Sequence, residues 1–298
     1  MRALFLIVLL APFFALAACS NLPPPQRAGV QPMVHDGNAE KGVERAIIMV
    51  PGALSSVELF APVMDWNVPN STVIAYRFPG VDGMKLDHRI DIVDSGAMIA
   101  RAVNALEVDE VYLIGYSTGG PIALETAKRL EADKVQIALI SSASDSPAAS
   151  LASLRGAVDI VKAMFRSKQQ GIDEAMLENY RTLLYGRDHF SKDELAEQSR
   201  QMAAMQRGQI VKPPNKMTMA HMADLLTWRF EDPSSVYDDR IGFFHGAEDS
   251  VFSEWLTRRY AKRLRAETFR SYEGQGHLLF VTEPHLFDDV RAFFGLGS

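Results

Sequence analysis

Two patterns of apolar residues alternate along most of the chain: short continuous runs, and longer stretches with apolar residues three or four positions apart. The short runs are typical of strands buried in a sheet, and they lie at residues 46–50, 72–78, 111–114, 134–140, 240–245 and 267–272. The longer stretches have the apolar stripe of a helix, and they lie at residues 57–66, 90–106, 121–130, 254–265 and 284–294. This alternation predicts an α/β fold, with a mostly parallel central sheet and helices on both faces.

The alternation is interrupted once. From residue 145 to about residue 233 no strand-like run occurs, and helical patterns occupy residues 149–165, 172–184, 192–207 and 218–229. The alternation resumes at residue 240. The sequence therefore predicts a core made of residues 46–144 and 234–298, with an all-helical cap of residues 145–233 inserted into it.

The N-terminus has the composition of a targeting signal. Arg2 is followed by an apolar stretch of residues 3–18, shorter than the ~20 residues that a membrane-spanning helix needs. Small residues precede Cys19, the only cysteine in the chain, as they precede signal-peptidase sites. We therefore predict a signal peptide at residues 1–19 and a flexible tether at residues 20–45, where three consecutive prolines occur.

The end of this signal resembles the lipobox of bacterial lipoproteins, in the sequence Leu16-Ala17-Ala18-Cys19-Ser20. The resemblance implies that Cys19 is lipidated and that the protein is held on a membrane by this N-terminal anchor. Ser20, rather than Asp, resembles the outer-membrane sorting signal of Gram-negative cells, which implies the periplasmic side of that membrane. The alternative is an ordinary secretory signal cut at Ala15-Leu16-Ala17, which would leave a soluble periplasmic or secreted protein.

Composition narrows the choice of function. The chain is 47% hydrophobic and 23% charged, as in ordinary globular proteins. A net charge of −6 and the lack of a basic stripe argue against a nucleic-acid partner. A single cysteine excludes an internal disulfide and a cysteine-based metal site. The spacing of Asp188, His189, His221 and Asp224 matches no metal motif, so we expect solvated or capping roles for them, and neither a metal nor a cofactor is implied.

The chemistry centres on residues 111–120, which predict a strand, a very tight turn and the start of a helix. Ser117 lies on that turn with Gly115 and Gly119 on either side, and the two glycines allow the strand and the helix to approach closely. The serine would project at the carboxyl end of the strand, where open α/β sheets bind ligands. The backbone N–H of Thr118 would then face an oxyanion formed there. This pattern, Gly-x-Ser-x-Gly, is that of a nucleophile elbow.

Three further motifs complete the pattern, namely Val50-Pro51-Gly52-Ala53, Gly246-Ala247-Glu248-Asp249 and Gly276-His277. Together with the elbow they make the chain, from about residue 46 to its end, resemble an α/β-hydrolase-fold serine hydrolase with a helical cap. The order Ser117, Asp249, His277 is that of the catalytic residues in this topology. The chain departs from the family at Pro51-Gly52, where many members have His-Gly.

The resemblance implies a role for each of these residues. Ser117 would be the nucleophile, His277 its general base, and Asp249 the carboxylate that orients the imidazole. The second oxyanion N–H would come from Ala53, with Leu54 as the alternative. Two other carboxylates remain open as the acid: Glu248, which adjoins Asp249, and Asp145, which follows the strand at residues 134–140. We expect His245 to be structural.

These residues predict a serine hydrolase that acts on a small acyl substrate, a carboxylic ester, through an acyl-enzyme intermediate. Thioester, amide and carbon–carbon hydrolases and cofactor-free haloperoxidases keep the same three residues and remain alternatives. A dehalogenase needs a carboxylate nucleophile, which Ser117 is not. An alternative from a different class is a non-catalytic anchored binding protein. Such a protein would not need Ser117, Asp249 and His277 together. The sequence predicts neither the substrate nor the oligomeric state.

Overall fold

The structure is a computed structural model that describes residues 23–25, 33–35, 42–168, 171–210 and 212–297. Cys19 and the predicted signal lie outside these residues. No helix in the described part of the chain is long and apolar enough to cross a bilayer.

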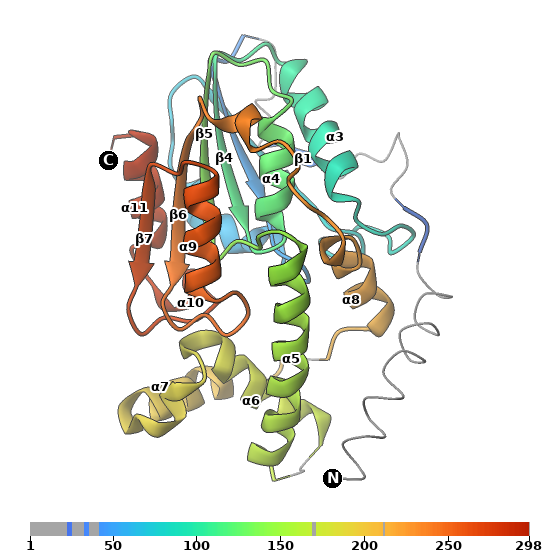
Figure 1. Cartoon of the computed structure of the whole chain (residues 1–298), viewed down its shortest axis with the longest axis vertical. Coiled ribbons are helices and arrows are strands. Elements are labelled where there is room, and N and C mark those ends of the chain that lie inside the picture. Colours follow the sequence, from blue (N-terminus) through green and yellow to red (C-terminus); the bar gives the residue numbers. More distant parts are fainter. Residues whose placement is uncertain (1–22, 26–32, 36–41, 169–170, 211, 298) are drawn as a thin grey trace.

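The centre of the molecule is a sheet of seven strands in the order β1-β3-β2-β4-β5-β6-β7 (Figure 1). The strands are β1 (Met33–His35), β2 (Arg45–Val50), β3 (Ser71–Tyr76), β4 (Glu110–Tyr116), β5 (Lys134–Ile140), β6 (Arg240–Gly246) and β7 (Thr268–Tyr272). Strands β2 to β7 are parallel, and β1 alone pairs antiparallel, with β3. The mostly parallel sheet is therefore confirmed. Strand β1 falls within the stretch expected to be a tether and forms one edge of the sheet.

Both faces of the sheet are covered because its strands are apolar on both sides. In β2, Ile48 and Val50 face one apolar core, while Ile47 and Met49 face the other. Helices α3 (Ile92–Asn104), α4 (Gly119–Ala127) and α9 (Glu254–Arg263) cover the first face. The second face is covered by η1 (Val57–Phe60), α2 (Ala61–Met64), α10 (Leu279–Thr282) and α11 (Leu286–Phe294). This arrangement confirms the expected α/β architecture.

Two helices differ most from their predicted extents. The helix expected at residues 57–66 is a 3-10 turn, η1, followed by the four-residue α2, and Ser56 caps the turn by accepting from the Glu58 N–H. Pro62 has no N–H to donate, so one continuous helix is disfavoured there. The helix expected at residues 218–229 is α8 (Asn215–Met222), which ends before the short 3-10 turn η3 (Asp224–Leu226).

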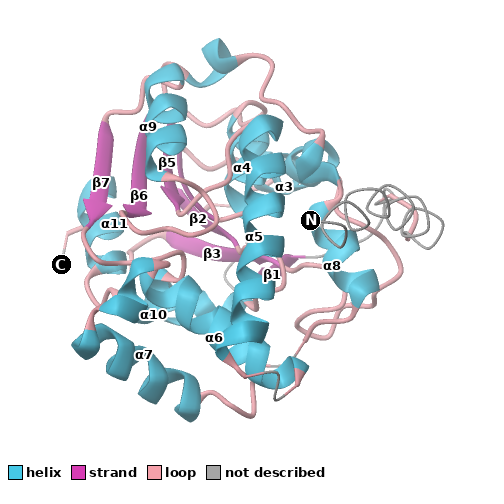
Figure 2. Cartoon of the chain, turned by 60° about the horizontal axis from the view of Figure 1, so that its bottom comes forward, coloured by secondary structure: helices cyan, strands magenta, loops and turns pink. Residues whose placement is uncertain are grey.

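Between β5 and β6 the described residues form only helices and turns, as expected. The helices are α5 (Ser146–Arg166), α6 (Ile172–Tyr185), η2 (Asp188–Ser191), α7 (Asp193–Met205), α8, η3 and η4 (Pro233–Val236). We call residues 145–233 the helical insert. Figure 1 shows α5, α6 and α7 beyond the carboxyl ends of the strands, and Figure 2 shows α6 beside α10.

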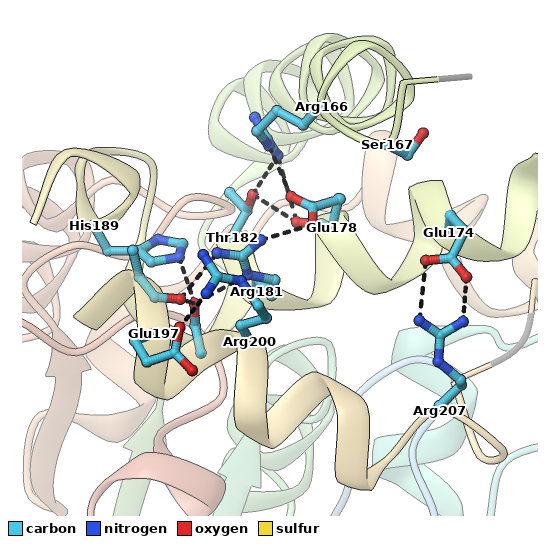
Figure 3. Close-up of polar contacts among 12 residues, drawn as sticks. Arg166, Ser167, Glu174, Glu178, Arg181, Thr182, His189, Glu197, Arg200 and Arg207 are labelled. Atoms are coloured by element: carbon cyan, nitrogen blue, oxygen red, sulfur yellow. Dashed lines mark hydrogen bonds and ion pairs between the residues drawn. The ribbon is translucent and has the colours of Figure 1, made fainter. Parts of the chain in front are cut away.

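Polar contacts join the helices of the insert (Figure 3). On α6, Glu178 accepts from Arg166 of α5 at 3.3 Å and from Arg181 at 2.7 Å. Arg181 also reaches α7, where it donates to the Ser199 hydroxyl at 3.1 Å and to the Ala196 carbonyl at 3.0 Å. Because Arg181 is buried, these partners offset the cost of removing its guanidinium from water. Charged side chains therefore join α5, α6 and α7 within the insert.

The turn between β4 and α4 is packed without room for side chains. A Cβ atom on Gly119 would lie 2.1 Å from the carbonyl oxygen of Val50, and one on Gly115 would lie 2.8 Å from that of Gly119. Backbone of β2, β4 and α4 thus meets directly at the carboxyl edge of the sheet. By contrast, a Cβ on Gly156, in the middle of α5, would have no atom within 4 Å.

Substitution by alanine should change the free energy of unfolding in opposite directions at Gly119 and at Gly156. Gly119→Ala should lower the free energy of unfolding by about 3 kcal/mol or more, because the clash is with backbone that cannot move aside cheaply. Gly156→Ala should raise it by about 0.5 kcal/mol, since alanine favours a helix interior. Urea unfolding followed by circular dichroism measures both. Equal stabilities of the two variants would contradict the close packing at residue 119.

Candidate active site

Ser117 lies on the turn at the end of β4 with a left-handed backbone, φ 51°. Backbone hydrogen bonds hold this uncommon conformation. The Ser117 N–H donates to the Ile140 carbonyl at 3.0 Å, and the Ser117 carbonyl accepts from Gly120 and Ala143 at 3.1 and 3.0 Å. The side chain is thereby held at the carboxyl edge of the sheet, as a nucleophile elbow requires.

Asp249 lies in the loop after β6 and is buried. One carboxylate oxygen, Oδ1, accepts from the Val251 and Phe252 N–H groups at 2.7 and 3.0 Å. The other, Oδ2, lies 2.8 Å from Nδ1 of His277. Since a carboxylate can only accept, Nδ1 of His277 carries the proton of that bond.

His277 follows β7 and completes the set. Its Nε2 lies 3.1 Å from the Ser117 hydroxyl oxygen. With the proton of the neutral ring on Nδ1, Nε2 is free to accept from that hydroxyl. The ring lies against Tyr116 and Phe252, with centroids 5.4 and 5.6 Å away. The structure thus brings together the three side chains that the sequence singled out, in a continuous chain of hydrogen bonds.

The loop that carries His277 is held by the helical insert. The Gly276 N–H donates to the Leu184 carbonyl at 2.8 Å, and the His277 and Leu278 N–H groups donate to the Leu183 carbonyl at 2.8 and 3.2 Å. Both carbonyls lie in the last turn of α6, where helical carbonyls have no partner within the helix. Nothing in the sequence signals this contact, because it is made entirely by backbone atoms.

The environment of Asp249 favours its charged form. Burial alone would raise the pKa of Asp249, but the charge and the hydrogen bond of His277 outweigh it, together with His245 and the Phe252 N–H, and the pKa lies below its ordinary value. An ionised carboxylate holds the imidazole in the tautomer just described. His245 is fully buried, and burial lowers its pKa. Its Nε2 donates to the Phe252 carbonyl at 3.0 Å, as suits the structural role expected for it.

The two alternative acids lie elsewhere. Asp145 accepts from the Phe230 N–H at 3.3 Å and pairs with Arg263. The Glu248 N–H donates to the Gln275 carbonyl, and the ring of His277 bonds to Asp249 and not to Glu248. The geometry therefore favours Asp249 among the three carboxylates.

The two predicted oxyanion donors flank Ser117. Within the described residues, neither the Ala53 N–H nor the Thr118 N–H has a hydrogen-bond acceptor. The Leu54 N–H, the alternative to Ala53, donates to Nδ1 of His221 at 2.9 Å. A Cβ on Gly52 would lie 2.9 Å from Cβ of Ser117, so this loop lies directly against the serine. Of the two candidates, Ala53 has the unengaged N–H.

Three of the four residues weighed as metal-like, His189, His221 and Asp224, have other partners, and Asp188 is exposed. In the described part of the chain no three or more His, Cys, Asp or Glu residues gather where a metal could bind. His189 and His221 are buried, so solvated roles for them are wrong, and burial lowers the pKa of both. His189 bonds to the Gly186 carbonyl at 2.6 Å and to the Ser199 hydroxyl at 3.0 Å. Asp224 accepts from the Ile92 N–H at 2.8 Å, which is a capping contact at the start of α3.

A parallel sheet with a serine on the sharp turn of a central strand, and an acid and a histidine after later strands, defines the α/β-hydrolase fold. The sequence profile of the Alpha/beta hydrolase family matches residues 47–290, and the chain belongs to this family. No curated protein matches the chain.

Three solved structures share the fold at low sequence identity. An α/β hydrolase, MGS-M2, from a Medee basin deep-sea metagenome is 12% identical with a TM-score of 0.63, covering 89% of this chain and 94% of its own. A structure reported with carboxylesterases of Nitrososphaera gargenis is 17% identical with a TM-score of 0.61, covering 89% and 93%. A bromoperoxidase of Bacillus anthracis is 13% identical with a TM-score of 0.61, covering 88% and 94%.

The lowered pKa of Asp249 makes stability depend on pH. A carboxylate whose pKa is lower in the folded than in the unfolded chain adds stability above its unfolded pKa and loses it as the pH falls through the folded value. The ordinary value is 3.8. The free energy of unfolding should therefore fall more steeply in the wild type than in Asp249→Asn between about pH 5 and pH 2. Asp288→Asn, which removes an exposed carboxylate, should follow the wild type. Parallel profiles for wild type and Asp249→Asn would contradict the lowered pKa.

Proposed function

We propose that the protein is a serine hydrolase that cleaves carboxylic esters through an acyl-enzyme intermediate. The observation that carries the proposal is the chain of contacts from Ser117 through His277 to Asp249, with separations of 3.1 and 2.8 Å. A serine hydroxyl is a weak nucleophile at neutral pH and needs a base within hydrogen-bond reach. His277 meets that requirement, and Asp249 stabilises the imidazolium that forms.

The reaction follows from these positions. Nε2 of His277 takes the hydroxyl proton as Oγ of Ser117 attacks the ester carbonyl, and the carbonyl oxygen becomes an oxyanion. The N–H groups of Ala53 and Thr118 donate to that oxyanion, and one such donor is typically worth about 3 kcal/mol. The imidazolium then protonates the departing alkoxide. Water, deprotonated by the same nitrogen, attacks the acyl-serine, and the imidazolium returns the proton to Oγ of Ser117 as the acid leaves.

Within the proposal, the choice of an ester as the substrate is more specific than the choice of a serine hydrolase. The similarity to a structure reported with carboxylesterases supports it. The similarity to a bromoperoxidase keeps cofactor-free haloperoxidase chemistry as the second candidate. A thioester, an amide or a carbon–carbon bond would use the same three side chains. A screen with esters of varied chain length, thioesters, amides and a halide–peroxide assay separates these activities.

Ser117→Ala should reduce the hydrolysis of p-nitrophenyl acetate by about 10⁴-fold or more, because the nucleophile is lost. A fluorophosphonate probe should label the wild type at Ser117 and leave this variant unlabelled. Ser150→Ala, which removes an exposed serine, is the control and should keep both properties. A wild-type protein that hydrolyses no ester and takes no probe would indicate a binding protein with an inactive site.

We further propose that Cys19 carries a lipid and that the α8 side of the helical insert lies near the membrane. The Arg89 N–H donates to the Pro24 carbonyl at 2.8 Å, so the chain joins the core at residue 24, five positions after Cys19. Five residues span at most about 18 Å. The neighbouring Ile90 N–H donates to the Ala220 carbonyl of α8, so a lipid on Cys19 would hold this side of the insert close to the bilayer.

Cys19→Ala should abolish the incorporation of labelled palmitate in a Gram-negative host and move the protein from the membrane fraction to the soluble fraction. The reason is that a thioether-linked lipid needs the Cys19 sulfur, and the chain has no second cysteine. Ser20→Ala leaves that sulfur in place and should still be labelled. Unchanged labelling of Cys19→Ala would refute the anchor at this residue, and a wild type that takes no label would favour the secretory signal.

A further inference from the structure

His221, on α8 of the helical insert, joins two segments of the core. Its Nδ1 lies 2.9 Å from the Leu54 backbone nitrogen, and its Nε2 lies 2.7 Å from the Pro79 carbonyl oxygen. An N–H can only donate and a carbonyl can only accept, so Nδ1 is the acceptor and Nε2 carries the proton. The ring is 1% exposed and packs edge-on against Phe78, with centroids 5.1 Å apart. Its partners therefore hold His221 neutral, in one tautomer and one orientation.

The loop that His221 contacts has a conformation that must be held in place. Leu54 has φ 65°, a left-handed conformation that is uncommon for a residue with a branched side chain. On the far side of the loop, Asp82 accepts from the Ser56 hydroxyl at 2.6 Å and from the Val57 N–H at 2.9 Å. His221 and Asp82 thus hold the loop by hydrogen bonds at two places, and the place held by His221 is next to Ala53.

We propose that His221 is a positioning residue for the oxyanion hole. By fixing the peptide between Ala53 and Leu54, it sets the direction of the neighbouring Ala53 N–H, which has no acceptor of its own among the described residues. His221 also accepts the hydrogen bond of the Leu54 N–H, so the Ala53 N–H is the donor that remains for the oxyanion. The inference rests on the proposed function. It implies that turnover depends on the packing of α8 against the core.

The chain offers a closely matched pair of substitutions at this position. Asn and Leu have the same number of side-chain heavy atoms and the same branching at Cγ, and Oδ1 of asparagine can take the place of Nδ1 of histidine, so His221→Asn keeps an acceptor for the Leu54 N–H. His221→Leu removes the acceptor and fills similar space. His189→Leu is the control for stability, because His189 is equally buried in the insert and also makes two hydrogen bonds, but neither reaches this loop.

Three quantities are measured for each variant at a temperature where all are folded: kcat and KM for a p-nitrophenyl ester, and the inhibition constant of a trifluoromethyl ketone. The ketone forms an oxyanion on Ser117 and so reports on the hole directly. In His221→Leu, kcat should fall about 10- to 100-fold with KM within about twofold, because a misplaced donor weakens the transition state more than the ground state. Inhibition by the ketone should weaken by a similar factor. His221→Asn should keep kcat within about threefold, and His189→Leu within about twofold.

Other results overturn the inference. If His221→Leu keeps kcat, or raises KM alone, His221 does not position the hole. If His221→Asn is impaired as severely as His221→Leu, the acceptor at Nδ1 is not the cause. These results require an active wild type, and they differ from failure of the proposed function itself, in which the wild type neither hydrolyses esters nor reacts with the fluorophosphonate probe.

Discussion

The whole site depends on one steric constraint, the direct contact of backbone with backbone at the end of β4. No Cβ fits on Gly119 beside the Val50 carbonyl, and none fits on Gly52 beside Ser117. The end of β2, the serine turn and the start of α4 can therefore meet without intervening side chains. That contact brings the Ser117 turn directly against the loop that carries Ala53.

The helical insert takes part in this arrangement and is more than a cover. Its α6 supplies the carbonyls of Leu183 and Leu184 to the loop of His277, through three hydrogen bonds. Arg187, just after α6, donates to the Ser250 carbonyl beside Asp249 at 2.6 Å. A net contribution of about 1 kcal/mol for each such bond makes separation of α6 from the core cost several kcal/mol. It would also release the loop of His277, so under the proposed mechanism α6 stays in place while substrate enters.

How far the sequence predicted this structure depends on the range of the interactions concerned. The strands, the turn at Ser117 and the glycines around it follow from local patterns, and those patterns were sufficient for the sheet. The pairing of Asp249 with His277 was predicted from chain order in a known topology. The contacts of Leu183 and of His221 could not be predicted, because they join segments that lie more than ninety positions apart and leave no periodic or compositional trace. For the same reason the sequence predicted only a solvated or capping role for His221.

The departure from the family pattern at Pro51 can now be explained physically. An oxyanion hole needs N–H groups in fixed directions, and a side chain at position 51 matters only through what it does to the backbone. Here the loop after Pro51 is fixed by side chains from other segments, Asp82 on one side and His221 on the other. A histidine at position 51 is then not needed to hold the loop. Under the proposed function, Asp82 and His221 hold the loop that carries the Ala53 N–H, so the identities of residues 51 and 52 alone do not decide how that N–H is placed.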